Sequence, residues 1–208
     1  MFQKIALVFA ALFVGLLVVI ATRPSTYRVE RAVVVKAPVD VAFSFVNDLH
    51  RFNEFSPWAD LDPAMKATYS GSESGVGAVY EWTGNKDVGS GRMTITGTVP
   101  GERVDIRLEF IEPFAATALT TFTVASEGDG SKVTWAMDGT NNFMSKAASL
   151  VLDMEKAIGG DFEKGLGRLA KLAEADAAAR EEKARQEAES AAAAEAPVEE
   201  AVEAPATP

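Results

Sequence analysis

Apolar and polar residues alternate along several short segments of this chain, a pattern that predicts β-strands. In the clearest segment, 103–110, apolar side chains alternate with charged ones: Val104, Ile106, Leu108 and Phe110 against Arg103, Asp105, Arg107 and Glu109. One face of such a strand is buried and the other is solvated, as in an antiparallel sheet. Further strands are predicted over 27–36, 65–70, 76–82, 92–98, 117–124 and 132–138. Short turns rich in Gly, Asp and Asn separate the later strands, which favours an antiparallel meander.

Residues 37–58 interrupt the strands with a helical pattern. Their apolar positions recur every three or four residues, as on the buried face of one helix followed by a second, shorter one: Val41, Phe45, Leu49, Phe52 and Phe55. Pro38 suits the first position of a helix, and Pro57 ends the pattern just before Trp58. The block is therefore interpreted as two small helices that close one end of the sheet.

A long amphipathic helix is predicted after the last strand. Its apolar residues step by four and then by three: Leu150, Met154, Ile158, Phe162, Leu166, Leu169 and Leu172. Gly159, Gly160 and Gly165 interrupt this helix, and each costs about 1 kcal/mol relative to alanine. Two interpretations stay open: the helix backbone packs closely or kinks at these glycines, or the missing side chains leave room for a bound molecule.

The N-terminus is predicted to be a membrane segment. Residues 5–22 are uncharged and almost wholly apolar, with Lys4 before them and Arg23 after them. Eighteen helical residues span roughly 27 Å, the thickness of a hydrocarbon core. A cleaved signal peptide, with Val19-Ile20-Ala21 before the cut, is the alternative. Charge favours a cytoplasmic domain, but the opposite orientation stays open.

Composition narrows the classes of protein. The chain has 208 residues, 48% of them hydrophobic and 24% charged, which fits one globular domain with appendages. The net charge is −10, and from Asp176 onward nine acidic residues stand against three basic ones. An acidic chain lacks the basic face that nucleic acids require. The absence of cysteine excludes disulfides and thiolate chemistry.

Two stretches of the chain carry a resemblance to a known family. They run from Val34 to Phe43, which includes Ala37-Pro38-Val39-Asp40, and from Asp48 to Trp58; residues 160–166 of the last helix support them. Over about residues 27–173 the chain resembles the START-like helix-grip superfamily, in its polyketide cyclase/dehydrase and lipid-transport (SRPBCC) branch. The resemblance implies an α+β fold: a seven-stranded antiparallel sheet, two small helices after its first strand, and a gripped C-terminal helix. It also implies a deep apolar cavity between sheet and helix.

The residues expected to line this cavity are the inward-facing aromatic and apolar side chains. They are Phe55, Trp58, Tyr80, Trp82, Met93, Phe110, Trp135, Met154, Ile158 and Phe162. An apolar pocket with a few polar groups is the usual site for a small molecule. Filling of the core is the alternative explanation for each residue taken singly.

No catalytic residue, metal site or cofactor is predicted. His50 is the single histidine and is placed on a surface turn, without the further His or Cys that zinc requires. Four carboxylates lie near the expected cavity, but nothing in their spacing pairs them: Glu54, Glu81, Asp138 and Asp153. Phosphate-loop, dinucleotide and nucleophile-elbow motifs are missing from the sequence.

These features divide the chain into an anchor or signal peptide over 1–26, a helix-grip domain over 27–174, and an Ala/Glu-rich tail over 175–208. The tail is expected to be helical at first and disordered from about Ala196. The leading hypothesis is a single-pass membrane protein that binds a hydrophobic small molecule or lipid. A polyketide cyclase/dehydrase-like enzyme, with a Tyr or carboxylate that moves a proton, and a non-catalytic envelope scaffold are the alternatives. The sequence does not define the ligand, the oligomeric state or a protein partner of the tail.

Overall fold

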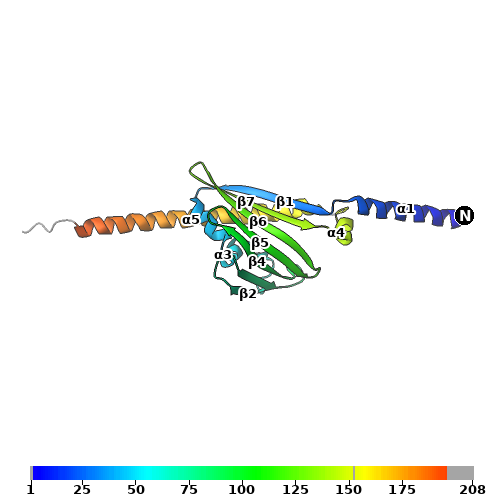
Figure 1. Cartoon of the computed structure of the whole chain (residues 1–208), viewed down its shortest axis with the longest axis horizontal. Coiled ribbons are helices and arrows are strands. Elements are labelled where there is room, and N and C mark those ends of the chain that lie inside the picture. The colour runs from blue at the N-terminus through cyan, green and yellow to red at the C-terminus, as the bar shows by residue number, and fades with distance from the viewer. Residues whose placement is uncertain (1, 152, 196–208) are drawn as a thin grey trace, which may run out of the picture.

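The computed structural model of the chain has an antiparallel sheet at its centre (Figure 1). It describes residues 2–151 and 153–195, without the side chains of Met154 and residues 193–195. The seven strands are β1 (Thr26–Val35), β2 (Lys66–Gly71), β3 (Ala78–Thr83), β4 (Ser90–Val99), β5 (Arg103–Glu112), β6 (Ala116–Glu127) and β7 (Gly130–Thr140). Their order is β1-β7-β6-β5-β4-β3-β2. The predicted α+β class with a seven-stranded sheet is confirmed.

The alternation in the sequence determines which face of the sheet is buried. Val104 and Ile106 of β5 are fully buried, whereas Arg103 and Arg107 are exposed on the opposite face. β7 shows the same division, with Val133, Trp135 and Met137 buried. Since every strand pair is antiparallel, these residues form one continuous inner face that the helices cover.

Two small helices follow β1, as predicted. They are α2 (Val39–Val46) and α3 (Leu49–Phe55), and a 3₁₀ turn, η1 (Pro57–Asp60), comes next. Pro38 stands one residue before the first helical position. The Asp48 side chain caps α3 by accepting a hydrogen bond from the backbone N–H of His50 at 2.8 Å. Because α2 and α3 separate β1 from β2, these two strands end up at opposite edges of the sheet.

The C-terminal part of the chain forms two helices where one was predicted. A short helix, α4 (Phe143–Ala148), follows β7, and the long helix α5 (Met154–Glu195) begins after it. α5 starts beside α4 and packs along β1, and its last part extends beyond the sheet (Figure 1). From Ala178 to Ala192 its residues are exposed. The disorder expected from about Ala196 lies outside the described residues.

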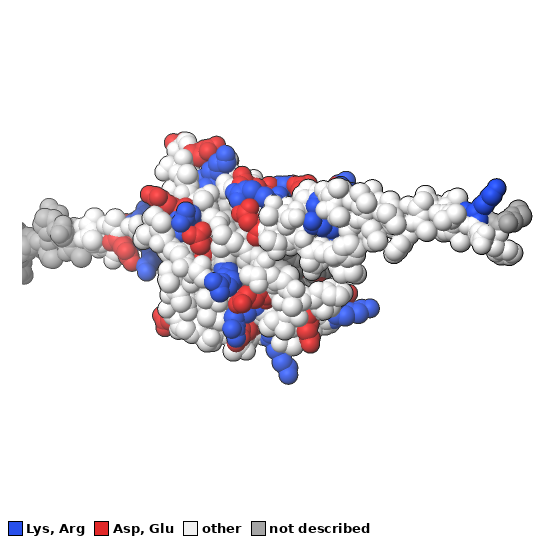
Figure 2. All heavy atoms as spheres, turned by 45° about the vertical axis from the view of Figure 1, so that its right-hand side comes forward, with Lys and Arg blue, Asp and Glu red and all other residues white. Residues whose placement is uncertain are grey.

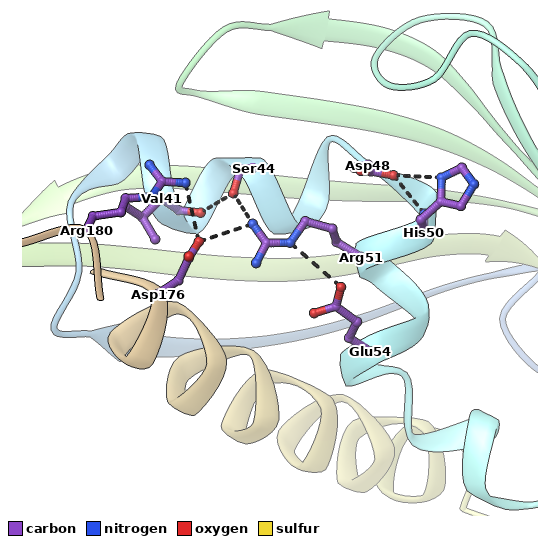
Figure 3. A network of polar contacts seen from close by, with 8 residues as sticks. All are labelled: Val41, Ser44, Asp48, His50, Arg51, Glu54, Asp176 and Arg180. Atoms are coloured by element: carbon purple, nitrogen blue, oxygen red, sulfur yellow. Dashed lines mark hydrogen bonds and ion pairs between the residues drawn. The ribbon is translucent and has the colours of Figure 1, made fainter. Parts of the chain in front are cut away.

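Arg51 of α3 joins the three helices at the end of the sheet away from α4 (Figure 3). Its Nη1 donates to Ser44 Oγ of α2 at 2.8 Å and to Asp176 Oδ2 of α5 at 3.3 Å. Its guanidinium carbon lies 3.4 Å from the centre of the Phe45 ring, a cation–π contact. Arg180, one helical turn after Asp176, donates to the same carboxylate and to Asp40 of α2. The middle of α5 is thus fixed to α2 and α3.

The N-terminal apolar segment forms the helix α1 (Phe2–Thr22), which projects from the domain (Figure 1). At 1.5 Å per residue it is about 31 Å long. Its side chains are exposed apart from Ile20, and its surface is uncharged between the two ends (Figure 2). Among the described residues, α1 is the one helix long and apolar enough to cross a bilayer; a signal sequence at this position would share these features.

Candidate ligand-binding site

The middle of the space between sheet and helices is filled by aromatic side chains. Trp135 of β7 stacks on Phe162 of α5, with ring centres 4.1 Å apart, and lies 4.9 Å from Phe122 of β6. Further rings pack edge-on around Trp135, namely Phe52, Phe55 and Trp58. At this depth, side chains of the protein itself occupy the space between sheet and helix.

One polar atom in this aromatic cluster has no partner. The Nε1–H of Trp135 makes no hydrogen bond to any described residue, although only 2% of the residue is exposed. Leaving a buried donor unpaired costs roughly 1–3 kcal/mol. A ligand that reached this depth would therefore gain by offering an oxygen to the indole N–H.

A second row of aromatic rings crosses the other half of the inner face. Tyr69, Tyr80, Trp82 and Phe110 follow one another with ring centres 5.2, 5.8 and 6.3 Å apart. Trp82 lies flat over Gly91 of β4, where an added Cβ would fall 2.4 Å from its ring. Burial, with a smaller effect of Tyr69, raises the pKa of Tyr80 to about 12, so its phenol is protonated at neutral pH.

A hollow lies at the end of the domain that carries α1. It has a volume of about 760 Å³, within the range of about 300–1,000 Å³ typical of ligand pockets. Its walls come from the start of β1, the end of β7, α4, the segment after α4 and the first turns of α5. The lining is Arg23, Pro24, Thr26, Tyr27, Arg28, Val29, Ala116, Thr140, Asn141, Ser145, Ala148, Ser149, Leu150, Val151, Asp153, Glu155 and Ile158.

The structure separates the predicted cavity residues into three groups. Phe55, Trp58, Trp135 and Phe162 belong to the aromatic cluster around Trp135. Tyr80, Trp82 and Met93 are buried on β3 and β4, and Phe110 of β5 is partly exposed. Ile158 lines the hollow. The Met154 side chain lies outside the described part of the structure. Cavity lining by the full set remains a prediction.

Sequence reasoning missed most of the residues that line the hollow. Tyr27 and Val29 carried a usable signal, because they lie on the inward-facing positions of the alternating segment 27–36. Leu150 was assigned to the long helix, whereas it lies in the turn after α4. Ala116 and Ala148 have side chains too small for the aromatic pattern that guided the prediction.

The three glycines of α5 that interrupt its apolar pattern have different surroundings. An added Cβ at Gly159 would fall 2.1 Å from Nη2 of Arg31, whose guanidinium spans the helix to reach Glu155 and Glu163. At Gly165 it would fall 2.9 Å from the Trp135 ring. At Gly160 it would meet nothing within 4 Å. Close packing therefore explains Gly159 and Gly165, and open space lies beside Gly160.

The polar residues considered for catalysis are engaged in structural contacts. His50 is exposed and stacks on Tyr69, with ring centres 3.9 Å apart, and its Nδ1 lies 3.1 Å from Asp48 Oδ1. Glu81 pairs with Arg92, and Asp138 pairs with Arg28. Within residues 2–151 and 153–195, no group of three or more acidic or histidine side chains is placed to hold a metal ion.

Glu54 and Asp153 are the other two carboxylates considered. Glu54 Oε1 lies 3.9 Å from Arg51 Nε, at the solvated end of α3. Asp153 lines the hollow, where its Oδ1 accepts a hydrogen bond from the backbone N–H of Lys156 at 3.1 Å. That bond places Asp153 as the cap of α5. Each of the four carboxylates thus has a structural partner in the described chain.

A second, shallower hollow of about 600 Å³ lies mainly on the outer face of the sheet. A row of registered residues crosses it from strand to strand: Arg28, Asp138, Leu119 and Arg107. Arg28 Nη1 and Asp138 Oδ2 are 2.5 Å apart. Charged and threonine residues are the majority of its lining, and it is more open to solvent than the hollow at the α1 end.

The fold defines the class of protein: a helix-grip domain, an architecture that supports a ligand-binding cavity. The chain belongs to the polyketide cyclase/dehydrase and lipid transport family, whose family model matches residues 26–174. The predicted resemblance is confirmed.

Solved structures agree with this fold. A protein from Chromobacterium violaceum, CV1439, is 19% identical, with a TM-score of 0.51 over 73% of this chain and 99% of that one. Ms6760 from Mycobacterium smegmatis is 16% identical, with a TM-score of 0.51 over 72% and 92% of the two chains. The di-domain ARO/CYC StfQ of the steffimycin biosynthetic pathway is 11% identical, with a TM-score of 0.53 over 74% of this chain and 52% of StfQ. No curated protein matches the chain significantly.

Proposed function

We propose that this protein is a membrane-anchored binding protein for a hydrophobic small molecule or lipid, and that the hollow at the α1 end is its binding site. The observation that carries the proposal is the position of this hollow: Arg23 and Pro24, directly after α1, form part of its wall. A ligand leaving a bilayer around α1 would enter the domain at this end.

The chemistry of the lining suits a mostly apolar ligand with a polar end. Val29, Leu150 and Ile158 supply apolar surface, whereas Arg23 supplies positive charge at the wall. The Arg28 guanidinium is paired with Glu30 and Asp138. Burial of apolar ligand surface favours binding by about 25 cal/mol per Å², before the cost of association. The family to which the chain belongs includes lipid transport, which supports the same reading.

The test is native mass spectrometry of the full chain extracted from membranes in a mild detergent. The wild-type protein is expected to retain a hydrophobic adduct. Ala148→Trp places a large ring in the hollow and should reduce the bound fraction about tenfold or more. Val76→Trp, on an exposed turn outside the hollow, is the matched control and should retain the adduct. A wild-type chain free of adduct, or an Ala148→Trp chain that keeps it, would refute the proposal.

Membrane anchoring is tested separately by the intact mass of the membrane-bound protein. An uncleaved anchor gives the mass of the whole 208-residue chain, about 22.1 kDa. Cleavage after Ala21 would remove α1 and leave the domain without its anchor. A cleaved protein that is washed from membranes by alkaline buffer would refute the anchoring part alone.

Tyr27 is the residue on which the enzyme alternative depends. It lines the hollow, and burial, followed by the negative charge of Asp138, raises the pKa of its phenol. The hydroxyl is therefore protonated at neutral pH and can donate a hydrogen bond or a proton. Tyr27→Phe keeps the ring over Gly139 and separates the two functions. A binding protein retains an adduct of unchanged mass, whereas an enzyme accumulates a precursor of different mass.

A further inference from the structure

Exposed apolar side chains gather at the end of the domain that carries α1. Beyond α1, every exposed phenylalanine in the described chain lies there: Phe110 near the end of β5, Phe114 in the β5–β6 turn, and Phe143 in α4. Phe114 is 79% exposed, and Met144, next to Phe143, is 70% exposed. Water-exposed phenylalanine at one end of a domain indicates a surface that contacts something apolar.

The position of α1 identifies what this surface meets. α1 ends at Thr22 and β1 begins at Thr26, and the three residues between them reach at most about 11 Å. α4 is attached to this short link: Lys146 Nζ donates to Ser25 Oγ at 2.9 Å, and Arg23 Nη2 donates to the backbone oxygen of Ser149 at 3.4 Å. If α1 spans a bilayer, α4 lies at the bilayer surface.

Both apolar elements border the hollow. Ser145 and Ala148 of α4 belong to its lining, and so does Ala116, two residues after Phe114. Phe143 and Met144 of α4 and Phe114 of the turn are exposed close in sequence to these lining residues. A flat apolar surface laid against both elements would lie next to the hollow.

We propose that α4 and the β5–β6 turn form a membrane-contacting surface that holds the opening of the hollow against the bilayer in which α1 stands. Phe143, Met144 and Phe114 enter the apolar layer just below the headgroups, as aromatic and apolar residues of interfacial helices do. Arg23 and Lys146 lie level with the lipid phosphates. The ligand then passes between bilayer and hollow without crossing water. This inference rests on the proposed membrane anchoring.

Site-specific labels test the proposal directly, because the chain has no cysteine of its own. Single-cysteine variants Phe143→Cys, Phe114→Cys and Val76→Cys of the full chain are labelled with an environment-sensitive fluorophore. They are then placed in nanodiscs of phosphatidylcholine and phosphatidylglycerol. Labels at 143 and 114 should lose quenching by iodide and gain quenching by spin-labelled lipid. The label at Val76, an exposed residue at the opposite end of the sheet, should be quenched by iodide alone.

Each outcome decides between the possible occupants. Labels at 143 and 114 that are as open to iodide as the one at 76 place this surface in water and overturn the proposal. Shielded labels in a chain that carries no adduct support the membrane contact and refute the ligand function. A chain that carries an adduct but whose labels are open to iodide supports the ligand function and refutes the membrane contact. Since the substituted side chains are exposed, loss of folding does not confuse the readout.

Discussion

At the scale of single residues, the glycines of α5 show how one residue type serves different packing needs. Gly160→Ala adds a methyl group in open space and removes the helix cost of glycine. We expect it to raise the free energy of unfolding by about 0.5–1 kcal/mol. Gly165→Ala brings a methyl group 2.9 Å from the Trp135 ring, inside a rigid aromatic cluster. We expect it to lower the same free energy by about 1–3 kcal/mol.

Urea unfolding of the two variants measures this contrast, and Gly159→Ala is the intermediate case. There the added methyl displaces the Arg31 guanidinium, which can move aside at the expense of its bridges to Glu155 and Glu163. In an Arg31→Ala background, Gly159→Ala should become stabilising, like Gly160→Ala. Equal effects at Gly160 and Gly165 would contradict the packing explanation.

The pKa of Tyr80 gives a pH dependence whose sign can be derived. Burial raises this pKa from 10 in the unfolded chain to about 12 in the folded protein. The folded state therefore retains the phenolic proton over this interval, and its stabilising effect is complete below pH 10. That contribution declines as the pH rises from 10 to 12. We expect stability to fall more steeply over this window in the wild type than in Tyr80→Phe.

Ultraviolet titration of phenolate provides the direct measurement. The chain has three tyrosines, and the pKa values of Tyr27 and Tyr69 are raised as well, chiefly by burial. Folded protein should therefore form phenolate later than protein unfolded in guanidinium. Tyr80→Phe should remove the last step of the titration. A folded protein whose tyrosines all titrate at the unfolded pKa would show that these rings are open to water.

The sequence indicated which residues face inward but not how deep each of them lies. Trp135 and Tyr27 both occupy inward positions of alternating strands, so periodicity treats them alike. Trp135 lies in the middle of the sheet, where six aromatic rings fill the interior, and Tyr27 lies at its end, beside the hollow. Depth depends on the register between strands that are far apart in sequence, and a single strand does not carry that information.

At the scale of elements, Arg51 determines how α2, α3 and α5 dock. Its guanidinium binds Ser44 and Asp176 and covers the Phe45 ring, and a quarter of the side chain is exposed. We expect Arg51→Ala to lower the free energy of unfolding by about 1–3 kcal/mol. Arg51→Lys keeps the charge but loses the planar fork, so its effect should lie between those of alanine and wild type.

Arg92→Ala is the matched control for Arg51, and denaturant unfolding is the measurement. Arg92 pairs with Glu81 on the outer face of the sheet and is about half exposed. A surface pair of this kind contributes about 0–1 kcal/mol. If Arg92→Ala and Arg51→Ala had equal effects, Arg51 would be one more surface charge rather than the residue that joins the helices.

The break between α4 and α5 escaped prediction because no glycine or proline marks it. Residues 143–158 contain neither of these residues, and the apolar spacing from Leu150 fits one helix. The usable signals were the two capping residues: Asn142 accepts a hydrogen bond from the N–H of Ser145, and Asp153 accepts one from the N–H of Lys156. Because one helix starts after Asn142 and another after Asp153, a turn separates α4 from α5. Residues of this turn line the hollow.

At the scale of the whole molecule, the domain has different neighbours at its two ends. α1 leaves from the end with the hollow, and the last part of α5 leaves from the other (Figure 1). The sequence located both appendages, because an apolar run and an Ala/Glu-rich run are local features. It did not reveal that α4 and the hollow stand beside α1, since that depends on the assembled sheet. If α1 anchors the domain in a membrane, the exposed part of α5, residues 178–192, would therefore point away from that membrane.

The end of the folded unit is tested by two truncations, because the contacts of α5 with the domain stop at a definite residue. Arg180 still binds Asp40 of α2, whereas the residues from 181 to 192 are exposed. A chain that ends at residue 181 should unfold at the same temperature as the full chain.

A chain that ends at residue 174 lacks the Asp176 partner of Arg51 and the buried Ala177. It should lose about 2–3 kcal/mol of stability, because the part-buried Arg51 guanidinium then lacks the Asp176 carboxylate and the cavity left by Ala177 is open. Thermal unfolding of both chains in the same detergent decides the point, and adduct retention should be unchanged in the longer one. If the chain ending at 181 were also destabilised, the exposed part of α5 would have to be folded back onto the domain or onto a second molecule.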